Sequence, residues 1–527
     1  MKRILLSVAF TAICFFSFAQ LNMEELGKLS YSDELSDIWG YVDEAGNEYA
    51  LVGTYSGLSV VDVTDPASPE EVYFGSGVSS IWRDIKTWGD YAYVSTEGGG
   101  GIFIVDLGPL PDGNITSTTY FSGSTYPFST VHNLYIDENG KLYIFGSNNG
   151  AGGAIICDLN ESPMNPTELG RFNNYYFHDG MAKDNILYGG AIYQGFFAAV
   201  DVSNPANPVV LGTAGTPGSF THNAWVSDDG NYVFTTDEVS SGYVAAYDIS
   251  DMDNIVQLDK VQSNPGSGVI PHNTHFMNDF VITSYYKDGV VIHDVSRPGN
   301  IVEVANYDTS PNYSGNGYAG CWGVYPFLPS GNIIASDIEE GLYILSVDYK
   351  HAAFVEGTVV DSISGNALSN VDWEVFGTFY SGQTDITGSF DFATLEAGSY
   401  TFQFSKEGYN TKTIEGVVLE NGELTELEVE MSMPSITGIS DKLDNALVRV
   451  FPNPFQTSTV IDYQFGDLDP NNASYQVFDL TGRIVEENQI TGQSGSIKIG
   501  SELLMGIYFV KINEGAGSSE IVKIVKR

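Results

Sequence analysis

The stretch SVVDVTDPASP, at Ser59–Pro69, joins a short apolar run to an aspartate and then to a proline-rich turn. The phrase returns as FIVDLGPLP (103–111), IICDLNESP (155–163), AAVDVSNPANP (198–208), AAYDISDMD (245–253) and VIHDVSRPG (291–299), with a degenerate copy, YILSVDYK (343–350). Its aspartates are Asp62, Asp106, Asp158, Asp201, Asp248 and Asp294, and Ser346 takes the seventh place. Successive copies lie 44, 52, 43, 47, 46 and 52 residues apart, which is the period of a β-propeller blade.

Each repeat contains four short runs with the character of strands. Between His132 and Phe172 these runs are HNLYID, LYIFGS, GAIICDL and TELGRF, separated by turns rich in Gly, Asn and Pro. Four antiparallel strands repeated seven times predict a seven-bladed β-propeller over residues 30–350, because a closed ring leaves few sheet edges exposed. We expect each repeated aspartate to accept hydrogen bonds from the backbone N–H groups of the turn that follows it.

Composition narrows the class of partner. The chain of 527 residues has a formal net charge of −45, so it lacks the cations with which proteins bind nucleic acid or anionic membrane surfaces. It has three cysteines. One of them, Cys14, lies in the leading apolar run, whereas Cys157 and Cys321 fall in different repeats, so we expect no disulfide framework.

The first 19 residues have the pattern of a signal peptide. Lys2 and Arg3 precede the apolar run ILLSVAFTAICFF, and the small residues Ser17 and Ala19 stand at the expected cleavage site. No other apolar stretch approaches the ~18 residues that a transmembrane helix needs. We therefore predict a secreted protein without a transmembrane segment.

The repeated phrase resembles the LVIVD repeat, and the chain as a whole resembles the choice-of-anchor B family of exported bacterial proteins. The resemblance covers roughly residues 36–349. The family name implies a shared β-domain with variable C-terminal anchors, and it implies no particular activity.

After residue 354 the period stops. Residues 354–432 resemble the carboxypeptidase regulatory-like domain, a small β-sandwich, through Gly357, Gly388, Gly398-Ser399-Tyr400 and Gly408-Tyr409. No zinc-ligand motif of a peptidase accompanies this domain, so we expect it to serve as a spacer or in adhesion.

Residues 433–447 are predicted to be a linker, and residues 448–527 resemble the type A sorting domain of the type IX secretion system. This resemblance implies passage by the Sec route and then across the outer membrane, to the cell surface or the medium, with the type IX machinery as a partner. The predicted fold is therefore all-β, with a seven-bladed propeller followed by two small β-sandwich domains. The motif residues are Asn453, Pro454, Gly482, Arg483, Gly506, Tyr508 and Lys526.

Histidine is rare in this chain, yet five of the seven histidines occur where the innermost strand of a blade begins. Because equivalent strand ends meet at one face of a propeller, we expect them to converge around the channel, with residues from the loops between second and third strands alongside. The candidate metal ligands are His132, His178, His222, His272 and His275, and the candidate ligand-binding residues are Glu97, Asp237, Glu238, Asp337, Glu339, Tyr193 and Tyr285.

Three interpretations of this face stay open. Imidazoles and carboxylates together suit a divalent metal ion such as Zn²⁺. Alternatively, each His–Asn pair braces the loops of its own blade, or the face binds an organic ligand. The chain shows no nucleophile elbow, HExxH, Walker or dinucleotide motif in the expected context, and we assign no catalytic residue. We therefore expect a binding or adhesion module for an extracellular glycan or protein, with a metal-assisted extracellular hydrolase or lyase as the alternative.

Overall fold

The computed structural model describes residues 20–111, 114–433, 447–464, 473–492, 494–514 and 519–527. Every regular element within these residues is a β-strand, so the predicted all-β class is confirmed. The structure also contains, over the same residues, no helix with the length and apolar character needed to cross a bilayer. The signal peptide predicted at 1–19 and most of the linker predicted at 433–447 lie outside the described residues.

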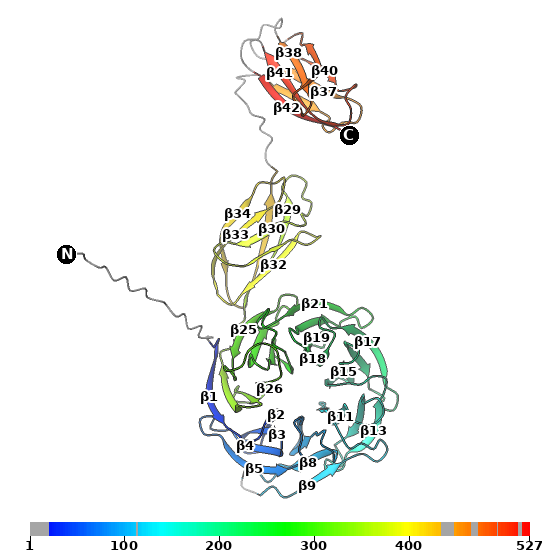
Figure 1. Ribbon diagram of the computed structural model, residues 1–527, viewed down its shortest axis with the longest axis vertical. Coiled ribbons are helices and arrows are strands. Elements are labelled where there is room, and N and C mark those ends of the chain that lie inside the picture. Colours follow the sequence, from blue (N-terminus) through cyan, green and yellow to red (C-terminus); the bar gives the residue numbers. More distant parts are fainter. Residues whose placement is uncertain (1–19, 112–113, 434–446, 465–472, 493, 515–518) are drawn as a thin grey trace, which may run out of the picture.

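Seven four-stranded antiparallel sheets follow one another around a closed ring (Figure 1). Blade 1 holds β2 (Leu35–Val42), β3 (Glu48–Thr54), β4 (Gly57–Asp62) and β5 (Glu70–Ser76), and blade 2 holds β6 (Ile85–Trp88), β7 (Tyr91–Val94), β8 (Ile102–Asp106) and β9 (Thr118–Phe121). Blade 3 holds β10 (Asn133–Ile136), β11 (Lys141–Phe145), β12 (Ala154–Asp158) and β13 (Thr167–Phe172), and blade 4 holds β14 (Gly180–Lys183), β15 (Ile186–Ala191), β16 (Phe196–Asp201) and β17 (Val209–Gly215). Blade 5 holds β18 (Thr221–Val226), β19 (Tyr232–Asp237), β20 (Val244–Asp248) and β21 (Val256–Val261), and blade 6 holds β22 (Thr274–Met277), β23 (Phe280–Ser284), β24 (Val290–Asp294) and β25 (Val302–Tyr307).

Blade 7 joins the two ends of the propeller sequence. Its three inner strands are β26 (Cys321–Tyr325), β27 (Ile333–Asp337) and β28 (Gly341–Val347), and its outer strand is β1 (Met23–Leu29). β1 pairs antiparallel with β28, with Met23 opposite Val347 and Leu29 opposite Leu342. This closing strand precedes residue 30, where the sequence pattern placed the start of the propeller. Its sequence, MEELGKL, contains nothing of the repeated phrase.

The six repeated aspartates have the role that their position predicted. Each accepts a hydrogen bond from the backbone N–H two residues further on, over 2.8–3.0 Å. The bond fixes the turn between the third and the outer strand of the blade. Cys157 and Cys321 are both free and buried, as expected.

The proline-rich turns also lock neighbouring blades together. A Cβ atom on Gly170, in the outer strand of blade 3, would lie 1.9 Å from the carbonyl oxygen of Pro205 in the turn of blade 4. The same contact recurs between Gly27 of β1 and Pro66 of blade 1, again at 1.9 Å. Only glycine leaves room for a turn to approach the preceding outer strand this closely.

The second domain is a sandwich of two sheets that packs on blade 6. Its sheets have the orders β32-β29-β35 and β31-β30-β33-β34. Asp294 accepts hydrogen bonds from the backbone N–H of Ala352 (2.7 Å) and from His351 (3.2 Å), and the ring of His351 stacks on Phe280 with centroids 4.6 Å apart. The side chain of Phe354 is buried in the same cluster as Phe280 and as Val304 of β25, and the second domain lies beside β25 in Figure 1. The strands are β29 (Ala353–Asp361), β30 (Asp372–Val375), β31 (Ser381–Gln383), β32 (Ser389–Thr394), β33 (Gly398–Ser405), β34 (Lys412–Leu419) and β35 (Leu424–Met431).

The third domain also contains two sheets, with the orders β36-β37-β40 and β39-β38-β41-β42. Val477, Val510, Ile512 and Ile524 belong to the buried cluster between them. The strands are β36 (Leu447–Phe451), β37 (Thr459–Gln464), β38 (Ala473–Phe478), β39 (Ile484–Gln489), β40 (Ser494–Ile499), β41 (Gly506–Glu514) and β42 (Ser519–Lys526).

Candidate functional site

Four histidines lie side by side at one end of the propeller channel. They are His132, His178, His222 and His272, one from the start of the innermost strand in each of blades 3, 4, 5 and 6. Their ring centroids are separated in turn by 3.9, 4.3 and 4.4 Å. The structure therefore brings together four of the five predicted histidines, because each takes the same position in its own blade.

Two of these imidazoles are oriented through Nδ1. His132 Nδ1 lies 2.6 Å from the carboxylate of Glu97, and His272 Nδ1 lies 2.6 Å from the carbonyl oxygen of Trp322. Both partners accept hydrogen bonds, so each Nδ1 carries the proton in the neutral imidazole and the lone pair is on Nε2. Metal-bound histidines are usually held by such partners.

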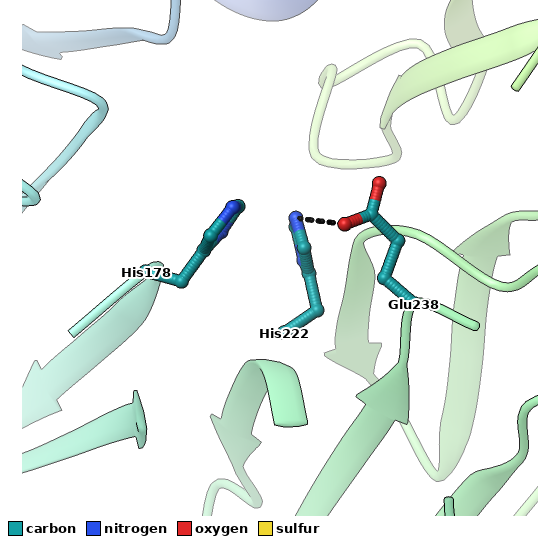
Figure 2. Close-up of side chains that lie close together, drawn as sticks. All are labelled: His178, His222 and Glu238. Atoms are coloured by element: carbon teal, nitrogen blue, oxygen red, sulfur yellow. Dashed lines mark ion pairs between the residues drawn. The ribbon is translucent and has the colours of Figure 1, made fainter. Parts of the chain in front are cut away.

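Glu238 follows β19 and turns its carboxylate towards the histidines. Its oxygens lie 3.8 Å from His222 Nε2 and 3.9 Å from His272 Nε2. Figure 2 shows that His178, His222 and Glu238 point towards one another. One possible ligand atom from each of these three residues lies within 4.8 Å of the other two.

Tyr286 holds this carboxylate in place. Its hydroxyl donates a hydrogen bond of 2.7 Å to Glu238 Oε1, and its ring lies 5.0 Å from that of His272. The backbone of Tyr286 has a φ of 33°, in the left-handed region that a bulky side chain rarely adopts. Such strain often accompanies a functional position.

Burial sets the charge states of the site. Loss of solvent lowers the pKa of His178 and of His222 well below the ordinary value, and neighbouring histidines lower it further. Burial also lowers the pKa of His272 to about 3, and it raises the pKa of Glu238 to about 7. At neutral pH the imidazoles of His178, His222 and His272 are therefore neutral, which is the form that binds a metal ion.

The residues present fit a divalent transition metal. Nδ1 of His178 and Nδ1 of His222 are buried without a hydrogen-bond partner, and Nε2 of His222 and of His272 face one carboxylate. The neutral imidazoles of His178 and His222 and the Glu238 carboxylate match the nitrogen and oxygen ligands that Zn²⁺ prefers, and His272 lies beside them. Within the described residues, one group of three or more possible metal ligands has its ligand atoms within 4.8 Å of one another. This group is His178, His222 and Glu238.

His275 lies apart from the other four histidines. It is three residues further along the innermost strand of blade 6, among the aromatic side chains at a different level of the channel. Its ring centroid is 4.5 Å from that of Trp225 and 5.8 Å from that of Phe327. These contacts make it part of the aromatic packing rather than of the histidine cluster.

Several predicted ligand-binding residues brace loops instead. Asp237 accepts hydrogen bonds from Thr216 and from the backbone N–H groups of Gly218 and Phe220. Asp337 accepts bonds from the hydroxyls of Thr309 and Ser310. Both carboxylates therefore accept hydrogen bonds from neighbouring turns and do not face the histidines.

Glu339 and Tyr285 also have structural partners. Glu339 accepts a hydrogen bond from the N–H of Gly320, and the fully buried Tyr285 hydroxyl accepts one from the N–H of Ser263. Neither residue contacts the four histidines, because local turns direct both side chains away from them. Of the predicted acids, Glu97 and Glu238 lie at the cluster.

Exposed aromatic side chains flank the cluster. Tyr193 is 73% exposed and packs against Tyr176, whose ring lies 6.3 Å from His178. On the other side Tyr318 is 55% exposed and packs edge-on against Tyr286. Sequence reasoning singled out Tyr193 but missed Tyr318, because the long loop before β26 breaks the repeat pattern in which the other candidates were found.

The predicted sorting residues make a compact set of contacts in the third domain. Asn453 bonds the backbone of Lys523 and Val525 in β42, and Lys526 donates to the carbonyl oxygens of Gly500 and Ser501. Tyr508 donates to the carbonyl oxygen of Leu504. Gly482, with a φ of 82°, lies in the turn before Arg483, which pairs with Asp479 at 3.0 Å.

Seven blades closed by an N-terminal strand, with a polar cluster at one end of the channel, define a β-propeller protein with two appended β-domains. The chain contains LVIVD repeats, matched at residues 45–73, 82–109 and 179–216. It also contains a carboxypeptidase regulatory-like domain at residues 355–432 and a secretion system C-terminal sorting domain at residues 449–527. The sorting domain marks the chain as cargo of the type IX secretion system, exported to the cell surface or the extracellular space.

Other comparisons add little beyond this domain composition. Comparison with curated proteins gives no match. Among solved structures, the β-propeller domain of Cps50 (Swd1) from Myceliophteria thermophila is similar over 61% of this chain and 99% of that one, with 10% identity and a TM-score of 0.44. The resemblance to the choice-of-anchor B family stays a prediction.

Proposed function

We propose that this exported propeller is a metal-dependent binding module for an extracellular glycan. The observation that carries the proposal is the arrangement of His222 Nε2 and His272 Nε2 around the Glu238 carboxylate, at 3.8 and 3.9 Å. His178 completes the set of ligands for a zinc-like ion. Glu97 and the Trp322 carbonyl orient the neighbouring imidazoles from outside the set.

The surroundings of the metal ligands favour a sugar. Tyr193 and Tyr318 present exposed aromatic faces on two sides of the cluster, and such faces stack on the apolar sides of sugar rings. A bound metal ion would supply a Lewis acid to which sugar hydroxyl or carboxylate oxygens coordinate. The sandwich and the sorting domain then serve as spacer and export signal.

The metal requirement is tested with the full-length protein. After incubation with zinc and removal of free metal, elemental analysis should find one zinc per chain in the wild type and a large loss in His222→Ala. The matched control is His275→Ala, which removes a channel histidine outside the cluster and should retain zinc. Equal zinc content in His222→Ala and wild type would contradict the proposal.

Ligand binding is tested on a glycan array before and after chelation. Zinc-loaded wild type should bind a subset of glycans, and both EDTA and His222→Ala should abolish that binding. If the zinc-loaded protein bound an extracellular protein but no glycan, the ligand would be a protein, and the proposed metal site would be unaffected. Binding that persists unchanged after chelation would contradict metal dependence.

A second candidate function is metal-assisted hydrolysis or lyase chemistry. One observation favours it: Glu238, whose pKa burial raises to about 7, can both accept and donate a proton near neutral pH. Cleavage of an array-positive glycan by the zinc-loaded wild type, absent in Glu238→Gln, would support an enzyme. An intact glycan after prolonged incubation would favour the binding module.

A further inference from the structure

A second polar layer lies one residue deeper along the innermost strands. Six blades place an oxygen-bearing side chain there, and blade 7 places Gly323. We call this layer the oxygen belt. None of its side chains is more than 6% exposed. The belt residues are Asp37, Asp84, Asn133, Asp179, Asn223 and Asn273.

Contacts between neighbouring blades join four of the belt residues in two pairs. Asn133 donates an amide hydrogen to Asp84 over 2.9 Å, and Asn223 donates one to Asp179 over 2.8 Å. Asp37 lies 3.5 Å from the ammonium group of Lys86 on the next blade. The acids also influence one another, since burial and then Asp37 raise the pKa of Asp84.

Three amide oxygens of the belt have no partner. Oδ1 of Asn133, of Asn223 and of Asn273 is buried without a hydrogen bond. The amide nitrogens of Asn133 and Asn223 already donate hydrogen bonds to carboxylates, which fixes the orientation of each amide. A buried acceptor left without a donor is costly, so three of them in one layer point to a cationic ligand.

The charges of the belt also lack compensation. Among the residues that the structure describes, Lys86 is the cation paired with the belt, against the three carboxylates of Asp37, Asp84 and Asp179. Its ammonium group donates to the Ile85 carbonyl oxygen over 2.9 Å and lies 4.1 Å from the ring centroid of Trp39. Burying carboxylates without enough positive charge is unfavourable, because each ion loses its hydration. A divalent cation would balance the negative charge that Lys86 leaves uncompensated.

We infer that the oxygen belt binds a hard divalent cation, with calcium as the best match. Calcium takes six to eight oxygen ligands, including carboxylates and asparagine carbonyl groups, and the belt offers both kinds. The histidine cluster above it offers mainly nitrogen, which transition metals prefer. The channel thus holds two sites of different ligand chemistry, and the belt site does not depend on the proposed function.

Thermal melting of the full-length, EDTA-treated and desalted protein tests the belt. With a Kd of about 10 μM, 1 mM calcium chloride should raise the melting temperature by about 4 °C. The double variant Asp84→Asn/Asp179→Asn should lose this rise. The matched control Asp62→Asn/Asp158→Asn removes two half-buried turn carboxylates away from the channel and should keep it. A wild type that melts at the same temperature with and without calcium would overturn the inference.

The two sites are distinguished by measuring both calcium and zinc binding in a variant of each site. In His222→Ala the calcium-dependent rise should persist while zinc binding is lost, so that failure of the histidine site leaves the belt test intact. A calcium rise of equal size in Asp84→Asn/Asp179→Asn would count against the belt.

Terbium luminescence provides a measurement that does not depend on folding of the double variant. Terbium replaces calcium and is sensitised by nearby tryptophan, and Trp39 lies in the channel beside Lys86. One equivalent of terbium on the wild type should give sensitised emission that excess calcium abolishes and that Trp39→Phe sharply reduces. Emission that is absent, or unchanged in Trp39→Phe, would overturn the inference.

Discussion

Each channel histidine has two ring nitrogens, and in two of them a hydrogen bond from Nδ1 leaves Nε2 free for a ligand. Nδ1 of His272 donates to the Trp322 carbonyl oxygen, and Nδ1 of His132 donates to the Glu97 carboxylate. Both partners come from neighbouring blades. Contacts between blades therefore orient these two imidazoles, whereas Glu238 faces His222 within blade 5.

Buried carboxyls away from the channel give a prediction that is independent of any ligand. Burial, opposed by the hydrogen bond from Asn306 and helped by the nearby Asp288, raises the pKa of Glu303 in β25 to about 7. The protonated form is the one that the fold favours, so its stabilisation is complete below the unfolded pKa and is lost as pH rises through 7.

We expect Glu303→Gln to match the wild type near pH 4.5 and to be more stable above pH 8, by up to about 3 kcal/mol. Asn306 donates to this side chain over 2.6 Å, and glutamine still accepts that bond. Denaturant unfolding at the two pH values measures the difference. Glu420→Gln, at an exposed position, is the control. An equal effect of Glu303→Gln at both pH values would contradict the prediction.

Much of the residue-level site was predictable, and the limit has a physical cause. The repeat position of His132, His178, His222 and His272 predicted their convergence because symmetry places equivalent residues together. The same logic could not separate Glu238 from Asp237. Adjacent residues at a strand end point in different directions, and hydrogen bonds from Gly218 and Phe220 decide which of them faces a loop.

At the scale of elements, the repeated phrase does two things. Its aspartate fixes the turn of its own blade, and in blades 1 and 4 the carbonyl group of that turn packs on a glycine in the outer strand of the preceding blade. A register shift interrupts the pairing of β12 and β13 just before Gly170. The bulge and the glycine together let the turn of blade 4 approach.

We expect Gly170→Ala to destabilise the propeller by about 1–3 kcal/mol, because the new methyl group meets the Pro205 carbonyl oxygen at 1.9 Å. The control is Gly299→Ala, in the turn of blade 6, where no atom lies within 4 Å of the added Cβ. Thermal melting compares the two variants. A similar melting temperature for both would show that the turn moves aside freely.

The strands of the repeats could be predicted from the alternation of apolar and polar residues, and β1 could not. Its seven residues include Glu24, Glu25 and Lys28, and they carry no aspartate–proline phrase. A strand at the outer edge of a blade needs few apolar residues, so its sequence gives little signal. Its place is determined by the unpaired edge of β28.

At the scale of the whole molecule, the ring depends on a strand from each end of the propeller. Asn22 adds a side-chain hydrogen bond to the carbonyl oxygen of Val304, and Tyr307 donates to Glu25. The N-terminal segment therefore holds blades 6 and 7 together. The sandwich packs on blade 6 through Asp294 and Phe354, so the same region supports both the closure and the second domain.

We expect a chain that begins at residue 30 to lose cooperative folding of the propeller, whereas a chain that begins at residue 20 retains it. Without β1 the outer edge of β28 is unpaired and the apolar side of blade 7 is exposed. Calorimetry and size-exclusion chromatography of both chains measure the effect. Equal melting temperatures would show that closure is not needed.

The pairing of Met23 with Val347 also sets an order of events. A chain that emerges N-terminus first delivers β1 at the beginning and β28 more than 300 residues later. At about 5–20 residues per second, the first strand waits for some tens of seconds before its partner exists. During that interval β1 presents two free edges, and its three charges are what discourage the wrong partners. Closure of the ring is thus timed by the length of chain between its first and last strands.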